Sequence, residues 1–256
     1  MPLSNLVLLV IAFFATSIIG VVTGSNSLIT VPLMFQFGID EKVAIATNMF
    51  GLTFMAVGGT IPFVRQGAID FRSLSPLVIV TVIGSAIGAA LVGLITNGAI
   101  KIIVIVAMVA VVLFTLLRRD RVATETKDTV RVPARLRHLR LVALISAFLL
   151  AIYGGLYSGG YVTVLTAALV AFSGMTFGES VAATKFINVF SSGIATLVFM
   201  WQGLVDYKLG IILAVAMFLG AFIGAHYATK LSEVWLRRVF ISTVVLLALK
   251  TLLDFV

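Results

Sequence analysis

Gln66-Gly67-Ala68-Ile69-Asp70 recurs as Gln202-Gly203-Leu204-Val205-Asp206, and the two stretches lie 136 positions apart. At the same offset, Gly84-x-x-x-Gly88 recurs as Gly220-x-x-x-Gly224. A repeat of both turn-forming and small residues at one constant spacing indicates that the chain contains an internal duplication.

The duplication extends upstream of these stretches. Ala46-Thr47-Asn48 matches Ala183-Thr184-Lys185 when one inserted residue is allowed, and Gly20-x-x-x-Gly24 matches Gly155-x-x-x-Gly159. Residues 19–118 therefore recur in outline at 154–254. A doubled set of hydrophobic segments is typical of secondary transporters, which bind their substrate between the two halves. Two fused copies kept only for packing are the alternative.

The composition is that of an integral membrane protein. Hydrophobic residues make up 61% of the 256 residues, charged residues only 11%, and the mean hydropathy is +1.20. Cysteine is absent, which excludes disulfides and thiol chemistry. The net charge of +8 does not indicate a nucleic acid partner, because eight of the 18 basic residues are concentrated in residues 118–140. A basic connector between apolar blocks predicts a cytoplasmic loop.

Six apolar stretches each match the length of about 20 residues that one helical crossing needs. They cover residues 43–64, 74–95, 99–117, 181–200, 209–229 and 236–253. Two further stretches, 3–37 and 139–173, are too long for one crossing and too short for two. Small and polar residues interrupt each of them halfway, at 23–27 and 157–161. We expect a full helix followed by a short helix in each, with the interruption facing protein or a wet cavity.

The predicted fold class is therefore all-α. It is a polytopic helical membrane protein with two inverted-topology repeats, each with about four long helices and one short broken or re-entrant helix. The first transmembrane repeat spans 1–118, the second 139–256, and residues 119–138 form a basic cytoplasmic linker. An inverted second repeat places 13 basic residues on the cytoplasmic side of the membrane and four on the outer side, whereas a parallel repeat places 12 and five there. The positive-inside rule thus favours inversion.

Lys185 points most directly to a function. An ammonium inside an apolar span costs about 2.5–3.5 kcal/mol on insertion scales, so it should face a cavity or a partner. Thr184 precedes it, Asn188 follows it, and Thr47 and Asn48 are the matching residues of the first half. Such a set of donors suits the binding of an anion. The alternative is a lysine that snorkels to the membrane interface from the first turn of its helix.

The two interruptions add uncharged donors. Glycine lets the backbone approach a ligand closely, and short helices that start at the interruptions direct their N-terminal N–H groups toward the same centre. The candidate substrate-binding residues here are Gly24, Ser25, Asn26, Ser27, Ser158, Gly159, Gly160 and Tyr161. Helix packing by small residues is the alternative for each one.

An enzyme is not expected. Ser158 and His226 form the one pair that resembles a hydrolase dyad, and Ser158 lacks the Gly-x-Ser-Gly surroundings of intramembrane serine proteases. The sequence contains no HExxH motif, no paired aspartates and no phosphate-binding loop. No metal, cofactor or ATP site is therefore expected.

Three stretches resemble a known family. Gly20-Val-Val-Thr-Gly-Ser-Asn-Ser-Leu-Ile-Thr-Val-Pro-Leu33, followed by Glu41-Lys-Val-Ala-Ile-Ala-Thr-Asn48, is similar to the first-repeat signature of the sulfite exporter TauE/SafE family. Arg65-Gln-Gly-Ala-Ile-Asp70 resembles the continuation of that signature. At residues 24–27 the chain has Gly-Ser-Asn-Ser where the family usually has a run of glycines.

The resemblance implies a multi-pass protein of the bacterial or archaeal inner membrane that transports small sulfur-containing or carboxylate anions. Together with the duplication and Lys185, it predicts a secondary transporter that exports sulfite or a related organosulfur anion by alternating access. An importer of carboxylate or other sulfur-containing anions and a passive anion channel are the alternatives. The expected partners are the small anion and the lipid bilayer, without nucleic acid, and a homodimer is one assembly that the sequence allows.

Overall fold

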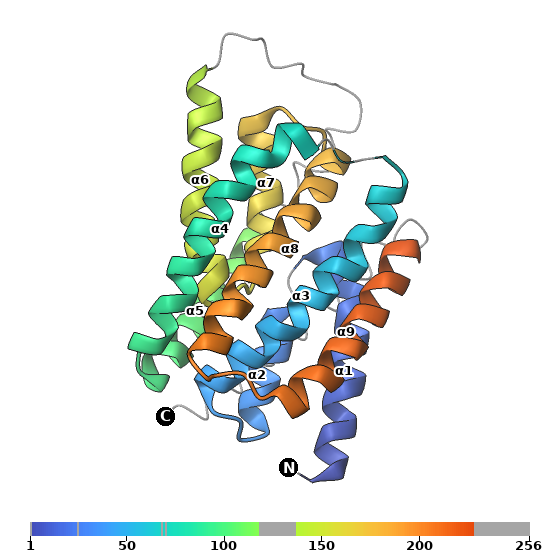
Figure 1. The fold of residues 1–256 in the computed structure, drawn as a ribbon, viewed down its shortest axis with the longest axis vertical. Helices are drawn as coiled ribbons and strands as arrows, with labels where there is room; N and C mark the ends of the chain where they lie inside the picture. The colour runs from blue at the N-terminus through green and yellow to red at the C-terminus, as the bar shows by residue number, and fades with distance from the viewer. Residues whose placement is uncertain (1, 25, 68, 70, 118–136, 228–256) are drawn as a thin grey trace.

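The computed structural model describes residues 2–24, 26–67, 69, 71–117 and 137–227. All regular secondary structure in these residues is helical, which confirms the predicted all-α class. The helices are α1 (Leu3–Thr23), α2 (Ser27–Gln36), α3 (Glu41–Arg65), α4 (Phe71–Leu94), α5 (Asn97–Leu117), α6 (Arg137–Leu156), α7 (Tyr161–Ser173), α8 (Phe177–Trp201) and α9 (Tyr207–Tyr227) (Figure 1). The predicted crossing at 236–253 lies outside the described residues, as does nearly all of the predicted linker.

The described helices lie where the apolar stretches predicted them, within a few residues at each end. Both long stretches are interrupted as expected, because α1 is followed by the 10-residue α2 and α6 by the 13-residue α7. The first half thus has four long helices and one short helix. α6 begins at Arg137, so the last two residues of the predicted linker, 137 and 138, are helical.

Local sequence sets the helix ends. The Asp40 side chain caps α3 by accepting hydrogen bonds from two backbone N–H groups of its first turn. Thr176 and Glu179 form a reciprocal capping box at the start of α8. After α3 and α8, the repeated Gln-Gly stretches form turns in which Gly67 and Gly203 have φ of +67° and +70°. Glycine adopts this left-handed conformation without strain.

Left-handed glycines recur in the two halves at one constant offset. Three pairs have φ between +62° and +82°, and the members of each pair are 136 positions apart: Gly24 and Gly160, Gly38 and Gly174, Gly67 and Gly203. The predicted match of Gly24 with Gly159 was therefore wrong by one residue. The turn geometry, which the letters alone do not reveal, makes Gly160 its counterpart.

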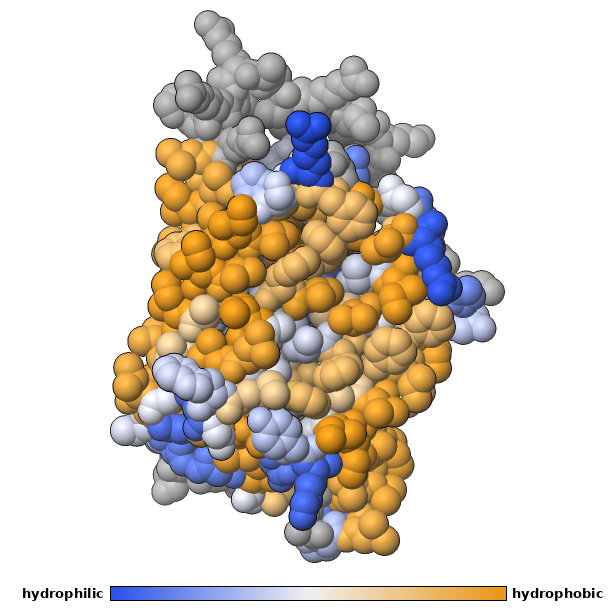
Figure 2. Space-filling model, in the orientation of Figure 1, coloured by the Kyte–Doolittle hydropathy of each residue, from blue (hydrophilic) through white to orange (hydrophobic). Residues whose placement is uncertain are grey.

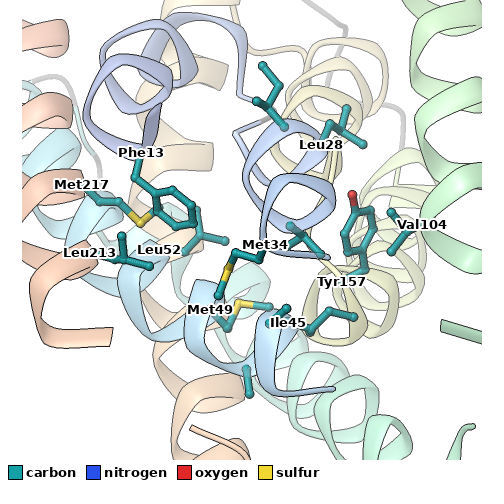
Figure 3. Packing of buried hydrophobic residues seen from close by; sticks show 14 of the residues in the cluster. Phe13, Leu28, Met34, Ile45, Met49, Leu52, Val104, Tyr157, Leu213 and Met217 are labelled. Carbon is teal, nitrogen blue, oxygen red and sulfur yellow. The ribbon is translucent and has the colours of Figure 1, made fainter. Parts of the chain in front are cut away.

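The same offset corrects the alignment of α3 with α8. Both helices have 25 residues and begin 136 positions apart, so no inserted residue separates them. Asn48 corresponds to Thr184, and Lys185 corresponds to Met49. Met49 lies beside Met34 in the apolar core (Figure 3). The cation consequently has no polar counterpart in the first half.

Two bundles form, and each contains helices from both halves. α9 packs against α1 and α3, whereas α4 packs against α6 and α8 (Figure 1). One bundle thus consists of α1, α2, α3 and α9, and the other of α6, α7, α8 and α4. α3 and α8 connect the bundles, and the hydroxyls of Thr53 and Thr196 meet there at 2.9 Å. The fourth helix of each half is exchanged into the bundle of the other.

Glycines bring the exchanged helices close to their partners. A Cβ added to Gly84 of α4 would lie 2.7 Å from the carbonyl oxygen of Phe148 in α6. A Cβ on Gly220 of α9 would lie 2.5 Å from the carbonyl oxygen of Phe14 in α1. These contacts confirm the two Gly-x-x-x-Gly stretches as helix-packing motifs.

The surface fits a membrane environment. Five of the described helices, α1, α3, α4, α8 and α9, are long and apolar enough to cross a bilayer. Figure 2 shows hydrophobic side chains over the middle of one face and hydrophilic side chains at both of its ends. α1 begins at the lower end of Figure 1 and α6 at the upper end, as inverted repeats would. The inverted repeat itself stays a prediction.

Candidate functional site

The two helix interruptions contact each other in the interior of the protein. Gly24 lies so close to the start of α7 that a Cβ there would be 2.9 Å from the side chain of Val162. From the other interruption, the Tyr157 hydroxyl donates a hydrogen bond of 3.1 Å to the carbonyl oxygen of Ser27. Figure 3 shows Tyr157 next to α2, near Leu28. The two short helices therefore begin near the same point.

A small cavity lies at this point, between the two bundles. It has a volume of about 20 Å³, roughly the space that one water molecule needs. Six of the predicted site residues line it: Gly24, Asn26, Ser27, Ser158, Lys185 and Asn188. The rest of the lining is glycine and apolar residues: Gly20, Val21, Leu52, Met55, Ala56 and Val162. The cavity thus has a polar part, with one cation, and an apolar part.

Lys185 is buried within the membrane-spanning region. It is the ninth residue of α8, about 12 Å along the axis from the start of the helix, and it is 5% exposed. Its ammonium donates a hydrogen bond of 3.4 Å to the carbonyl oxygen of Gly20 on α1. A side chain that points across to another helix in the interior is not snorkelling to the interface.

The Lys185 ammonium has no acidic partner among the described residues. The ion pair that these residues do form joins Lys101 to Glu41. Glu179, the acidic residue nearest to Lys185 in the sequence, is held by Thr176 in the capping box. A buried cation without a counter-ion is unfavourable, so this cavity favours an anionic ligand.

Ser158 is held in a conformation that few residues adopt. Its φ is +68°, in the left-handed region that glycine normally occupies. For a residue with a side chain this costs about 1–3 kcal/mol, and such strain is concentrated at binding and catalytic sites. His226, which the sequence analysis considered and rejected as a dyad partner of Ser158, lies exposed near the end of α9, outside the residues that line the cavity.

Asn48 lies next to the cavity without lining it. Its amide donates to the Ser27 hydroxyl at 3.0 Å, and its oxygen accepts from the Thr30 hydroxyl at 2.7 Å. Both ends of the amide are therefore occupied. The structure places Asn48 as a support for Ser27 rather than as a direct ligand.

Two predicted threonines point elsewhere. The Thr47 hydroxyl accepts a hydrogen bond of 3.0 Å from the backbone N–H of Asp206, at the start of α9. The Thr184 hydroxyl accepts one of 3.2 Å from Thr166 on α7. Neither residue lines the cavity. For Thr184 the reason is that adjacent positions on a helix face about 100° apart, so it points away from the side on which Lys185 lies.

The remaining predicted residues support the second interruption. Tyr161 is fully buried, and its ring packs in an apolar cluster. Gly159 accepts a hydrogen bond from the Tyr153 hydroxyl through its carbonyl oxygen, and Gly160 packs against Val111. Ser25 lies outside the described residues.

Four residues that were not predicted from the sequence also shape the site. The hydroxyl of Ser17 and the sulfur of Met55 both accept hydrogen bonds from the Asn26 amide, at 3.3 and 3.2 Å. Thr30 holds Asn48, and Thr166 holds Thr184 in the same way, 136 positions later. That recurrence was visible in the sequence and could have identified both threonines.

A second, larger pocket does not fit an anion. It has a volume of about 540 Å³ and lies between the α3–α4 turn and the α7–α8 turn. Among the residues that line it, Glu179 is the charged one. A carboxylate as the one charged group of the described lining repels anions, so the small cavity remains the candidate site.

Comparison with known proteins identifies the family. The sequence pattern of the family described as Sulfite exporter TauE/SafE matches residues 8–251. The chain belongs to the sulfite exporter TauE/SafE family. It is accordingly a multi-pass membrane transporter, as the composition and the helices predicted.

Relatives in the TauE/SafE family match over almost their whole length. "Probable membrane transporter protein ORF9" from a Sinorhizobium species is 26% identical over 249 residues, covering 97% of this chain and 93% of the relative. A "Probable membrane transporter protein" from Haemophilus influenzae is 24% identical, covering 94% and 92%. "Probable membrane transporter protein YfcA" from Escherichia coli K12 is 23% identical, covering 96% and 90%. No solved structure matches the chain significantly.

Proposed function

We propose that this protein is a secondary transporter that carries small anions, sulfite or a related organosulfur anion, outward across the cytoplasmic membrane by alternating access. The observation that carries the proposal is the buried Lys185 ammonium, which lines a cavity and has no acidic partner among the described residues. Low dielectric strengthens the attraction between this cation and an anion. The family description supplies sulfite as the leading candidate.

The cavity lies where alternating access requires it. α1, α2 and α3 of one bundle and the break between α1 and α2 contribute its uncharged wall. The other bundle contributes Ser158 from the break between α6 and α7, Val162 from α7, and Lys185 and Asn188 from α8. With room for about one water molecule, the cavity must widen to admit an oxyanion of four or more atoms. We propose that rotation of one bundle against the other opens it to each side in turn. A gradient of the substrate or of protons would drive net transport.

Flux measurements in proteoliposomes test the function. Purified protein in vesicles should export or take up labelled sulfite faster than protein-free vesicles, with a rate that saturates as substrate increases. Thiosulfate and small carboxylates, tested in parallel, separate the organosulfur substrates from the carboxylate alternative. Unlabelled substrate on the far side should accelerate exchange, as it does for a carrier. Flux that never saturates and shows no exchange would identify a channel, and absence of flux for every anion would overturn the proposal.

A further inference from the structure

The cavity offers one positive charge to a substrate. Lys185 is the only charged residue among the described residues that line it, and the polar remainder is the uncharged Asn26, Ser27, Ser158 and Asn188. A dianion held there would keep one negative charge without a partner in a low-dielectric site. Burying an unpaired charge is strongly unfavourable, so the cavity is matched to a monoanion.

The cavity also contains side-chain oxygens that can accept a hydrogen bond from a ligand. The side-chain oxygens of Asn26 and Asn188 are buried and have no hydrogen-bond partner within the described part of the chain, and both residues line the cavity. A buried polar atom without a partner is unfavourable, and a bound ligand is one way to satisfy it. An anion that carries no hydrogen cannot do so.

The orientation of the Asn26 amide is determined by its neighbours. The Ser17 hydroxyl donates its hydrogen to the Phe13 carbonyl oxygen at 2.6 Å, so toward Asn26 it can only accept. The Met55 sulfur has no hydrogen to donate either. Both contacts require the NH₂ group of Asn26, which leaves the amide oxygen as the free acceptor.

We propose that the transported species is a monoanion that brings its own hydrogen-bond donor, and that for sulfite this species is hydrogensulfite rather than the sulfite dianion. The Lys185 ammonium binds the negative oxygens, and the acidic hydrogen of the ligand meets the Asn26 oxygen, with Asn188 as a second acceptor. This inference rests on the proposed function. One consequence is that each transported sulfite carries one proton with it. The proton travels on the ligand, so the protein needs no proton-binding residue in the cavity.

The test compares sulfite with methanesulfonate, which is a monoanion at every pH used and has no acidic hydrogen. Proteoliposome flux of both is measured from mildly acidic to mildly alkaline pH, and the flux of protein-free vesicles is subtracted at each pH. Hydrogensulfite loses its proton near neutral pH, so the sulfite flux at low concentration should fall about tenfold for each pH unit above that transition. Among the described residues, Lys185 is the only titratable side chain in the cavity lining, and the Tyr157 hydroxyl reaches the lining through its hydrogen bond to Ser27. Any titration of the protein affects both substrates, so the ratio of the two fluxes reports the substrate alone.

Two variants test the acceptor. Asn26→Ala should lower the ratio of sulfite flux to methanesulfonate flux at mildly acidic pH by about tenfold, as expected when a hydrogen bond to a charged ligand is lost. Asn48→Ala is the matched control, because the oxygen of that amide already accepts from Thr30. It should lower both fluxes together and leave the ratio unchanged. Asn188→Ala repeats the test if Asn26→Ala yields no folded protein.

The outcomes separate the two proposals. A sulfite flux that rises relative to methanesulfonate at alkaline pH, or a ratio unaffected by Asn26→Ala and Asn188→Ala, would overturn the monoanion inference while leaving an anion transporter. Inhibition of sulfite flux by equimolar sulfate, a dianion, would also count against it. If neither substrate moves faster than in protein-free vesicles, the proposed function itself fails.

Discussion

Removing the Lys185 ammonium is the most direct perturbation of the site. Lys185→Met keeps most of the side-chain volume and installs the residue that the first half has at the corresponding position, Met49. The fold should tolerate it, because the one hydrogen bond lost is long, at 3.4 Å. The Gly20 carbonyl oxygen keeps its other donor, the backbone N–H of Gly24 at 2.7 Å. A bound anion, in contrast, loses a charge-assisted hydrogen bond worth about 1.5–3 kcal/mol.

That loss corresponds to roughly a 10- to 150-fold weaker affinity. The assay is saturable sulfite flux into proteoliposomes, together with thermal unfolding of the purified variants. Lys185→Ala should behave like Lys185→Met, and Lys185→Arg should recover transport only in part, because its planar fork is larger than an ammonium. The control is Lys101→Met, which removes a partly exposed lysine paired with Glu41 and should leave flux nearly unchanged. Wild-type flux and KM in Lys185→Met would refute the assignment of this cavity as the substrate site.

Two further predictions concern packing and motion. Gly84→Leu forces a side chain against the α6 backbone and should destabilise the protein by about 1–3 kcal/mol, measured as a lower unfolding temperature; an unchanged temperature would mean that α4 and α6 are not in close contact. Because the natural chain has no cysteine, paired cysteines can link chosen helices, and a disulfide between Thr53→Cys and Thr196→Cys should stop transport until it is reduced. The pair Ser85→Cys and Ser191→Cys, whose hydroxyls lie 2.7 Å apart within one bundle, should leave transport intact when linked. Loss of transport in both linked pairs would show that the bundles are not the moving units.

The interruptions of the long apolar stretches could be predicted from the sequence because their cause is local. Glycine and small polar residues in the middle of an apolar run break a helix wherever they occur, and Gly24 and Gly160 both mark such breaks. Lys185 was identified for a similarly local reason, since a cation is costly in an apolar span. Both signals are properties of a few adjacent residues, so they need no knowledge of the fold.

Side-chain directions depended on helix register, which the sequence did not determine. One inserted residue in the alignment paired Asn48 with Lys185, whereas the helices pair Lys185 with Met49. A shift of one position on a helix turns a side chain by about 100°. That is why Thr47, expected at the site, instead holds the start of α9. The orientation of the Asn26 amide, which leaves its oxygen as an acceptor, could not be predicted from the sequence either, because it depends on where Ser17 and Met55 lie.

In the proposed mechanism, the hydrogen bond between Lys185 and Gly20 links substrate binding to movement of the bundles. The hydrogen bond from Lys185 to Gly20 joins α8 of one bundle to α1 of the other across the cavity. An anion that enters the cavity competes with the Gly20 carbonyl oxygen for the same ammonium. In the proposed mechanism, binding of the substrate therefore replaces a bond between the bundles with a bond to the ligand. Because a ligand shifts a conformational equilibrium only through its different affinity for the two states, a cation shared between the bundles and the substrate supplies that difference at the point where the bundles must separate.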